Sequence, residues 1–218
     1  MREKVSKLLQ IEKDISEFYV ICEKYPLLKK VKRDLYGFRD THFSDLFNGI
    51  LLALTLQMTT WKRSLSMLEY LYLVYGERIR FDGQEIIISP LPNTIEKIRE
   101  GEIREKCKIG YRANYLKSIA STLIRGFPSL DELERLSPLK AKRKLMELKG
   151  IGEYSADIVT PHPSFPVDIW SVKVFSKFFG IETERVKNPI NFVKEYANRE
   201  FGKWLGTFFS FSFPLSPV

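Results

Sequence analysis

Residues 145–157 of the chain read LMELKGIGEYSAD. An apolar helical pattern ends at Lys149, two glycines flank Ile151, and a second helical pattern starts directly after them. We therefore predict two helices joined by a tight hairpin, with Ile151 pointing inward to fix the turn. Gly150 and Gly152 are expected to adopt backbone conformations that are closed to other residues.

Glycines at this place would leave amide N–H groups uncovered at the start of the second helix, where a phosphate can bind. Such a contact holds DNA without reading its base sequence. The alternative is an ordinary corner between two helices, because G-x-G alone is a weak motif. The candidate phosphate-binding residues are Lys149, Gly150, Gly152 and Tyr154.

Helical periodicity extends in both directions from this hairpin. From Phe43 to Leu54, apolar residues recur at i, i+3, i+4, i+7, i+8 and i+11, which predicts a helix with one continuous buried stripe. Further helices are expected at about 62–75, 94–99, 111–124, 129–136, 138–148, 169–179 and 190–201. The chain is therefore predicted to be mostly α-helical.

Three segments depart from this pattern. Arg78–Phe81 and Gln84–Ile88 flank Asp82-Gly83, which suits the positive φ angles of a tight turn, so a small β-hairpin is expected near residues 78–88. Residues 160–166 read TPHPSFP and cannot be helical, because proline removes amide donors and fixes φ; an ordered loop or lid is expected. The final run FFSFSFPLSPV is apolar enough to dock on the body.

The composition suits a protein that binds a polyanion. The 218 residues include 35 Lys and Arg against 27 Asp and Glu, a formal net charge of +8. The two cysteines, Cys22 and Cys107, are too few for a four-cysteine iron–sulfur or zinc site, and we expect no metal or other cofactor. Because no apolar run approaches a signal peptide or a membrane span, we expect a cytoplasmic protein, nucleoid-associated in a prokaryote, without a membrane partner.

Three stretches taken together are more specific. LKGIGEYSADIV, residues 148–159, is followed by a proline-containing loop and then by Asp168, sixteen residues after Gly152. LQMTTW occupies residues 56–61, and KIGYRANYL occupies residues 108–116. With these stretches the chain resembles the helix-hairpin-helix (HhH-GPD) superfamily of DNA glycosylases, in its alkylation-repair and 8-oxoguanine branch without an iron–sulfur cluster. One departure is Lys149, which stands where the superfamily usually has proline.

The resemblance implies a two-lobed, mostly α-helical fold. Residues 45–160 would form a six-helix barrel that carries the hairpin, and residues 1–44 with 161–218 a second helical domain, with the catalytic cleft between them. The implied partner is double-stranded DNA that contains a damaged or mismatched base, and the implied process is base excision repair. A monomer would suit an enzyme that scans DNA.

The resemblance gives Asp168 the role of the catalytic carboxylate. Cleavage of a glycosidic bond builds positive charge on the sugar as the base leaves, and an ionised carboxylate beside C1′ stabilises that charge. Asp168 also directly precedes the helix expected at 169–179, where aspartate is a natural N-cap. The two roles are compatible, because a capping carboxylate is held in one orientation.

The resemblance also bears on the nucleophile. Bifunctional members carry a lysine two residues after the second hairpin glycine, and it forms a Schiff base with the sugar. This chain has Tyr154 there, and a phenol cannot form an imine, so a monofunctional enzyme that uses water is implied. The alternative is that Lys149, Lys173 or another amine supplies lyase activity.

Extrusion of a base leaves a gap in the stack that a side chain must fill. Gln57 is our first choice for this wedge and Met58 our second; the alternative is that both merely end a helix. An aromatic face attracts an electron-deficient alkylated base, although most aromatic residues belong to the core and a loop histidine is usually solvated. The candidate base-pocket residues are Trp61, Tyr154, Trp170 and His162.

The substrate is expected to be an alkylated purine such as 3-methyladenine, since the lyase lysine and the cluster cysteines are missing. Thymine or uracil opposite guanine stays open, because a tyrosine after the hairpin also occurs in mismatch glycosylases. The segment Gly110–Arg112 keeps 8-oxoguanine open as well. A hypothesis of another class is a non-catalytic DNA-binding module that uses the hairpin only as a phosphate clamp.

Overall fold

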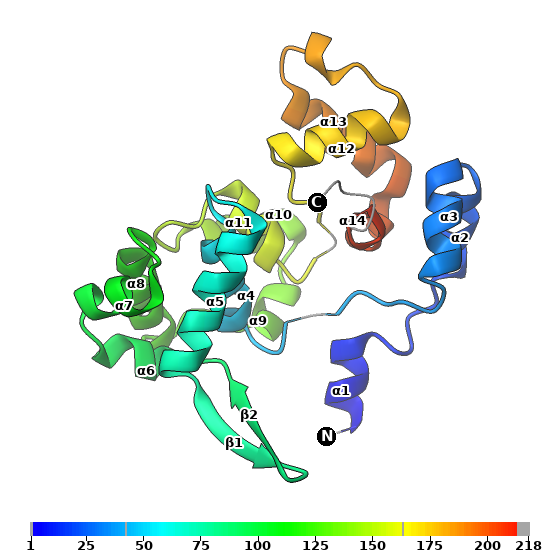
Figure 1. Cartoon of the computed structure of the whole chain (residues 1–218). Coiled ribbons are helices and arrows are strands. Elements are labelled where there is room, and N and C mark those ends of the chain that lie inside the picture. The colour runs from blue at the N-terminus through cyan, green and yellow to red at the C-terminus, as the bar shows by residue number, and fades with distance from the viewer. Residues whose placement is uncertain (1, 42, 163, 213–218) are drawn as a thin grey trace. The chain divides into compact units, whose positions relative to one another are not determined.

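The computed structural model describes residues 2–41, 43–162 and 164–212. These residues form a mostly helical protein with a small two-stranded sheet, as the sequence predicted (Figure 1). The chain divides into two compact units. Unit 1 comprises residues 1–42 and 162–218, and unit 2 comprises residues 43–161. Each unit has a hydrophobic core of its own.

The helices and strands follow the chain in a simple order. Unit 2 contains α4 (Leu46–Leu56), α5 (Trp61–Tyr75), β1 (Glu77–Phe81), β2 (Gln84–Ile88), α6 (Pro92–Lys97), α7 (Glu100–Cys107), α8 (Arg112–Ile124), α9 (Leu130–Glu134), α10 (Pro138–Met146) and α11 (Glu153–Val159). Unit 1 contains α1 (Arg2–Leu9), α2 (Ser16–Glu23), α3 (Pro26–Asp34), α12 (Ile169–Phe179), η1 (Thr183–Arg185), α13 (Pro189–Phe201), η2 (Gly202–Trp204) and α14 (Leu205–Ser212). Over the described residues, every helix is too short or too polar to cross a bilayer.

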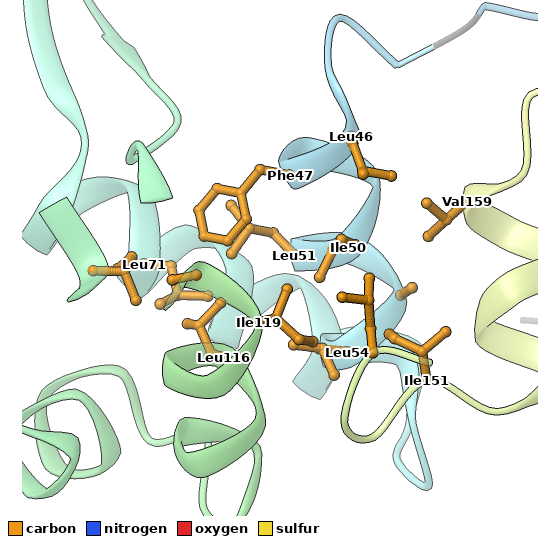
Figure 2. Close-up of a cluster of buried hydrophobic side chains, with 14 of the residues drawn as sticks. Leu46, Phe47, Ile50, Leu51, Leu54, Leu71, Leu116, Ile119, Ile151 and Val159 are labelled. Atoms are coloured by element: carbon orange, nitrogen blue, oxygen red, sulfur yellow. The ribbon is translucent and has the colours of Figure 1, made fainter. Parts of the chain in front are cut away.

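Helix α4 is the central element of the unit 2 core. Its sequence LFNGILLALTL is apolar on nearly every side, and Ile50 and Leu51 are fully buried. Figure 2 shows side chains of α8 and of the hairpin region, among them Leu116 and Ile151, gathered around α4. The core therefore fixes the end of α4, from which the LQMTTW stretch continues.

The start of α4 differs from the expectation. The periodic pattern included Phe43, but the helix begins at Leu46 because the Asp45 carboxylate accepts a hydrogen bond from the Asn48 amide at 2.9 Å and caps it. Phe43 instead covers Gly49, where an added Cβ would lie 2.9 Å from its ring. The buried stripe itself was predicted correctly.

The predicted β-hairpin is confirmed. Strands β1 and β2 pair antiparallel, and Phe81 pairs with Gln84 across the turn. Asp82 and Gly83 both have positive φ angles, 49° and 74°. This is the conformation that a two-residue turn between twisted strands requires.

Helix α7 was not predicted from the sequence. Its sequence EGEIREKC has few apolar residues, of which Ile103 and Cys107 are buried. The helix ends at Lys108, whose φ of 54° is left-handed. It lies against α8 and so supports the start of that helix.

The core of unit 1 is rich in aromatic rings. Phe201 and Phe208 stack with their centroids 3.9 Å apart, and Phe18 of α2 meets Phe211 edge-on at 5.0 Å. Helices from both ends of the chain thus share one core. The expected docking of the final run is confirmed for Phe208 and Phe211, while residues 213–218 lie outside the described part.

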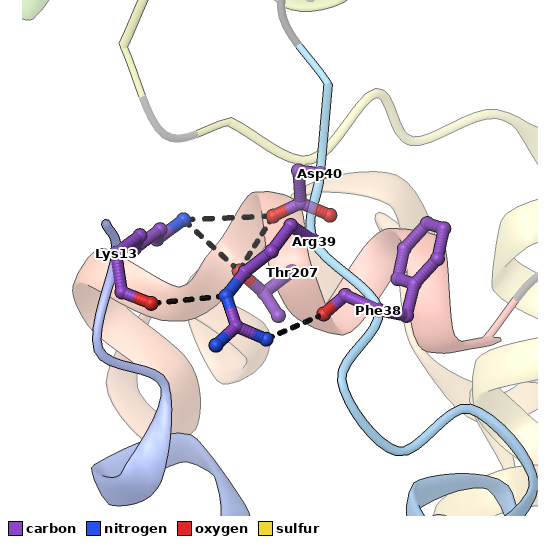
Figure 3. Close-up of polar contacts among 5 residues, drawn as sticks. All are labelled: Lys13, Phe38, Arg39, Asp40 and Thr207. Atoms are coloured by element: carbon purple, nitrogen blue, oxygen red, sulfur yellow. Dashed lines mark hydrogen bonds and ion pairs between the residues drawn. The ribbon is translucent and has the colours of Figure 1, made fainter. Parts of the chain in front are cut away.

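A polar network joins three segments of unit 1 (Figure 3). Arg39 Nε donates to the Lys13 carbonyl at 3.0 Å, and Thr207 Oγ1 donates to Asp40 Oδ2 at 2.6 Å. Lys13 Nζ lies 3.6 Å from the same Asp40 oxygen. The segment after α3 is therefore tied both to the loop between α1 and α2 and to α14.

The loop that leads to Asp168 contains no helix or strand among its described residues, 160–162 and 164–168, as expected. Pro163 lies outside the described part. Phe165 and Val167 are 7% and 4% exposed and belong to the unit 1 core. Packing of these two side chains orders the approach to α12.

Candidate catalytic and DNA-binding sites

Asp168 caps the N-terminus of α12, as predicted. Its backbone is extended, and its Oδ1 accepts hydrogen bonds from the Ser171 amide at 2.7 Å and the Ser171 hydroxyl at 2.8 Å. Both bonds reach the same oxygen, and among the described residues nothing donates to Oδ2. The carboxylate thus has one fixed oxygen and one that a substrate or a water molecule can use. The positive end of the α12 dipole favours a negative charge here.

The surroundings of Asp168 change from buried to exposed within a few residues. Val167 lies in the core, Asp168 is half-buried, and Ile169 is 71% exposed. The carboxylate therefore stands at the surface of unit 1 on a rigid base. Of the two predicted neighbours, His162 is half-buried, and the side chain of Trp170 lies outside the described part.

In unit 2 the predicted hairpin is present between α10 and α11. Ile151 is 5% exposed and belongs to the core, so the expected inward direction is confirmed. Its amide donates to the Leu148 carbonyl at 3.0 Å and closes the turn. Gly150 has a φ of +87°, and a Cβ there would overlap the ring of Tyr115. Both observations require glycine at this position.

The expectation for Gly152 was wrong. Its φ of −93° and ψ of −173° are open to any residue, and no atom lies within 4 Å of an added Cβ. Gly152 is exposed and forms the N-cap of α11. A glycine here provides clearance at the backbone rather than an unusual conformation.

An ion pair fixes the two helices of the hairpin relative to each other. Lys142 Nζ of α10 lies 2.8 Å from Asp157 Oδ1 of α11, and the Asp157 side chain is 7% exposed. Burial weakens the screening of this pair by water but also removes hydration from both charges, so its main effect is that loss of Lys142 would leave a costly negative charge at Asp157. The angle between α10 and α11 is therefore defined by more than the turn.

Gln57 contacts the hairpin directly. Its Nε2 donates to the Gly150 carbonyl at 2.7 Å and to the Ser155 hydroxyl at 3.0 Å. The amide of our first-choice wedge is therefore directed at the hairpin in this structure. Met58, the second choice, has a φ of 46° and is 94% exposed, so its side chain projects into solvent.

Arg112 holds the segment that presents these two residues. The side chain is only 8% exposed; its Nε donates to the Leu54 carbonyl at 2.9 Å and its Nη2 to the Gln57 carbonyl. The last carbonyls of a helix lack partners within it, and Arg112 donates to one of them, that of Leu54, and to the carbonyl of the C-cap residue Gln57. Sequence reasoning quoted this arginine as part of a motif but missed its contact, since nothing local connects it to residues more than fifty positions earlier.

Two further residues of the stretch KIGYRANYL, Asn114 and Tyr115, contact the hairpin. Lys149 Nζ donates to Asn114 Oδ1 at 2.6 Å, and Asn114 Nδ2 donates to Glu100 Oε2 at 2.9 Å, which lowers the pKa of Glu100. The Tyr115 ring covers Gly150. The three stretches that carry the resemblance are therefore brought together around the hairpin, where Lys149 is anchored to α8.

Two candidate base-pocket residues lie in unit 2. Trp61 begins α5 and is 50% exposed, and Tyr154 lies in the first turn of α11 and is half-buried. His162 and Asp168 belong to unit 1. The predicted site residues are thus distributed over both units.

Two features characterise the fold. A hairpin joins α10 to α11 and is contacted from the end of α4, and a carboxylate caps the N-terminus of α12. The chain has the fold of 3-methyladenine and 8-oxoguanine DNA glycosylases, which is the fold that the resemblance implied. The 3-methyladenine DNA glycosylase from Archaeoglobus fulgidus superposes with a TM-score of 0.82 at 22% identity, over 99% of this chain and 73% of that one. The 8-oxoguanine glycosylase/lyase from Clostridium acetobutylicum, bound to double-stranded DNA with cytosine opposite 8-oxoguanine, gives 0.80 at 20% identity, over 95% and 71%.

Sequence relatives are glycosylases too. The chain is 23% identical to a DNA-3-methyladenine glycosylase of Bacillus subtilis (strain 168), over 79% of this chain and 61% of that protein. It is also 23% identical to a probable N-glycosylase/DNA lyase of Methanothermobacter thermautotrophicus, over 93% and 70%. The chain thus spans about three fifths of the Bacillus protein. No family model matches the sequence.

Proposed function

We propose that this chain is a monofunctional DNA N-glycosylase of base excision repair that hydrolyses the bond between deoxyribose and an everted, damaged base. The carboxylate of Asp168 carries the proposal, because Ser171 fixes its Oδ1 and leaves Oδ2 open. As the base departs, C1′ becomes positive, and a carboxylate beside it lowers the barrier. The same carboxylate can orient or deprotonate the attacking water. The glycosylases among the relatives support this reaction class.

The hairpin would hold the duplex beside the lesion. The first amides of a helix lack partners within it, so the amides at the start of α11 are the groups that can donate to a phosphate. Open space at Gly152 lets a phosphate oxygen approach the backbone, and Lys149 adds positive charge nearby. In this arrangement Tyr154 lies on the same turn as the bound phosphate.

Met58 is the better candidate for the wedge. Its side chain is free to enter a base stack, whereas the Gln57 amide would first have to leave Gly150 and Ser155. We therefore assign the wedge to Met58 and a supporting role to Gln57. Trp61 and Tyr154 are proposed to contact the everted base through their rings.

Water rather than an amine is the proposed nucleophile. Tyr154 stands at the position of the Schiff-base lysine, and the Lys149 ammonium is hydrogen-bonded to Asn114. An end-labelled lesion duplex incubated with the protein should show strand cleavage only after hot alkali. Cleavage without alkali, or an adduct trapped by borohydride, would instead indicate lyase activity. The Methanothermobacter relative is named a probable N-glycosylase/DNA lyase.

An alkylated purine such as 3-methyladenine is the proposed substrate. Alkylation makes the base cationic and a good leaving group, so one carboxylate and one water suffice. A favoured alternative is 8-oxoguanine, because a glycosylase/lyase for that base shares the fold. Duplexes with 3-methyladenine, 8-oxoguanine, or thymine or uracil opposite guanine should be compared under single-turnover conditions. Faster release of any other base than of 3-methyladenine would reassign the substrate.

A further inference from the structure

A cationic face lies on α3 in unit 1, far along the sequence from the hairpin. Leu28 and Val31 anchor the helix, with 0% and 4% exposure, and so direct its remaining residues to solvent. We define the α3 cationic face by Lys29, Lys30, Lys32 and Arg33.

Carboxylates neutralise this face only in part. Glu23 is shared by two lysines: Lys29 Nζ lies 3.0 Å from one oxygen, and Lys32 donates to the other. Arg33 meets Asp34 at 3.5 Å in a pair that is largely exposed and therefore weak. Four cations thus stand against the two carboxylates of Glu23 and Asp34, which leaves a net positive patch.

An exposed tyrosine borders the patch. Tyr36 is 77% exposed and stacks on Tyr19 with ring centroids 5.2 Å apart. Lys32 Nζ lies 5.9 Å from the Tyr19 ring centre. Tyr36 and the four basic residues of α3 line one open hollow on the surface of unit 1. The ring of Tyr36 is therefore supported by Tyr19 and lies beside the cations.

We propose that the α3 cationic face binds the phosphate backbone of duplex DNA, as a second contact surface besides the hairpin. Lys29 and Arg33 are one helical turn apart, about 6 Å along the axis, so that neighbouring phosphates are within reach of long side chains. Lysine, arginine and the tyrosine hydroxyl are all groups that contact phosphate without reading sequence. The proposal rests on the proposed function only in taking DNA as the partner.

A membrane surface fits this helix less well than DNA. An amphipathic helix that lies on a bilayer must insert its apolar face among the lipids. Leu28 and Val31 are packed in the unit 1 core, and among the described residues of α3, Leu27, at 40% exposure, is the one large apolar side chain presented to solvent. The binding free energy available to α3 is therefore electrostatic, which suits a polyanion of high charge density.

Salt dependence of DNA binding tests the proposal. A variant with Lys29→Gln, Lys30→Gln and Arg33→Gln is compared with a control that removes three exposed charges elsewhere, Lys97→Gln, Arg99→Gln and Arg125→Gln. Kd for an undamaged duplex is measured by fluorescence anisotropy between about 50 and 200 mM salt. We expect the slope of log Kd against log salt to fall by about 2 to 3 in the α3 variant and by less than about 1 in the control. Equal slopes in the two variants would overturn the proposal.

This measurement is independent of catalysis, because the duplex carries no lesion. If no lesion is released by the wild-type protein but the α3 variant still loses slope, the DNA contact stands and the glycosylase proposal fails. If the wild-type protein releases a base and the α3 slope is unchanged, the reverse holds. Anionic vesicles added as competitors should leave the slopes unchanged. If the wild-type protein binds the vesicles and the α3 variant does not, a membrane surface rather than DNA is the partner of the α3 cationic face.

Crosslinking provides a direct measurement. Cys22 and Cys107 are fully buried, and burial raises the pKa of each thiol to about 12, so an introduced surface cysteine reacts selectively. A photo-crosslinker attached at Lys30→Cys should join the protein to duplex DNA in high yield. The same group at Glu105→Cys, exposed on α7, is the control, and equal yields would contradict the α3 contact.

Discussion

The carboxylate of unit 1 and the hairpin of unit 2 are positioned in different ways. Asp168 is held by Ser171, three residues farther along, through the first turn of its own helix. The hairpin at Gly150 is held by Gln57 from the end of α4 and by the Tyr115 ring from α8. One arrangement is local, and the other depends on tertiary contacts between segments far apart in sequence.

This difference follows from what each site has to provide. The proposed reaction requires one carboxylate in one orientation, and a helix N-cap supplies that from a few neighbouring residues. A phosphate site made of backbone amides requires one defined backbone conformation. A turn that contains glycine has many accessible conformations, so other segments must pack against it to select one. We therefore expect changes at Asp168 to affect chemistry alone, and changes around Gly150 to affect both stability and DNA binding.

The largest expected effect is on catalysis. Asp168→Asn should lower single-turnover base release by about 100-fold or more, because the amide cannot stabilise positive charge on the sugar. Asparagine caps a helix as well as aspartate does, so the free energy of unfolding should change by less than about 0.5 kcal/mol. Quenched-flow release of base and urea unfolding measure the two quantities.

Asp45 provides a matched control for that prediction, because its side chain caps α4 by accepting from the Asn48 amide at 2.9 Å. Asp45→Asn should leave the rate of base release unchanged. A comparable loss of rate in both variants would point to a folding defect. Unchanged release after Asp168→Asn would remove this carboxylate from catalysis.

The hairpin glycines should separate stability from DNA binding. Gly150→Ala forces a positive φ on alanine and overlaps Tyr115, so it should lower the free energy of unfolding by about 2–3 kcal/mol. It should also weaken binding to undamaged duplex. Urea unfolding and fluorescence anisotropy give both values for each variant.

Gly152→Ala is the matched change in the same turn. Its φ is compatible with alanine and its surroundings are open, but alanine is a poorer N-cap than glycine, so the two effects should largely offset and the free energy of unfolding should change by less than about 1 kcal/mol. If a phosphate binds here, DNA affinity should nevertheless fall. Full affinity in Gly152→Ala would refute the backbone contact at this glycine.

The same contrast explains how far the sequence predicted the structure. The buried stripe of α4, the Asp-Gly turn and the cap at Asp168 each depend on residues close in sequence, and each was predicted. Helix α7 was missed because it buries only Ile103 and Cys107, too few for a periodic signal. Helices α1, α2 and α3 were not predicted one by one for a similar reason. Each has only eight or nine residues, which is too short for a clear periodic pattern.

The site followed the same rule. The three stretches lie together around the hairpin, but sequence reasoning did not supply the contacts that join them. Gln57 binds Gly150 across 93 positions, and Arg112 binds the Leu54 carbonyl across 58. Gly152 was given a conformational reason that its φ of −93° does not support. Such details depend on how elements pack, which no local pattern records.

Removal of the Arg112 side chain should separate its effect on the wedge segment from its effect on folding. Arg112→Met loses hydrogen bonds to the carbonyls of Leu54 and Gln57, so stability should fall by about 2–3 kcal/mol. Base eversion, followed by 2-aminopurine fluorescence, should fall about tenfold, because a shift of the Met58 segment by about 1 Å misplaces the wedge.

Lys117 offers the control, since it also donates to main-chain carbonyls, those of Glu96 and Ile98, at the end of α6. Lys117→Met should cost stability and leave base eversion as in the wild type at a temperature where both variants are folded. Similar eversion in the two variants would show that Arg112 contributes to the fold alone.

The smallest expected effect distinguishes the two wedge candidates. Met58→Ala should slow base eversion by about three- to tenfold without any change in unfolding, because the side chain is 94% exposed and contributes little to the fold. Gln57→Ala should instead lower stability by about 1–2 kcal/mol, since the Gly150 carbonyl and the Ser155 hydroxyl lose a donor. If Gln57→Ala impairs eversion at full stability while Met58→Ala does not, the first choice made from the sequence was right. The Gln57 amide must then leave the hairpin when DNA binds.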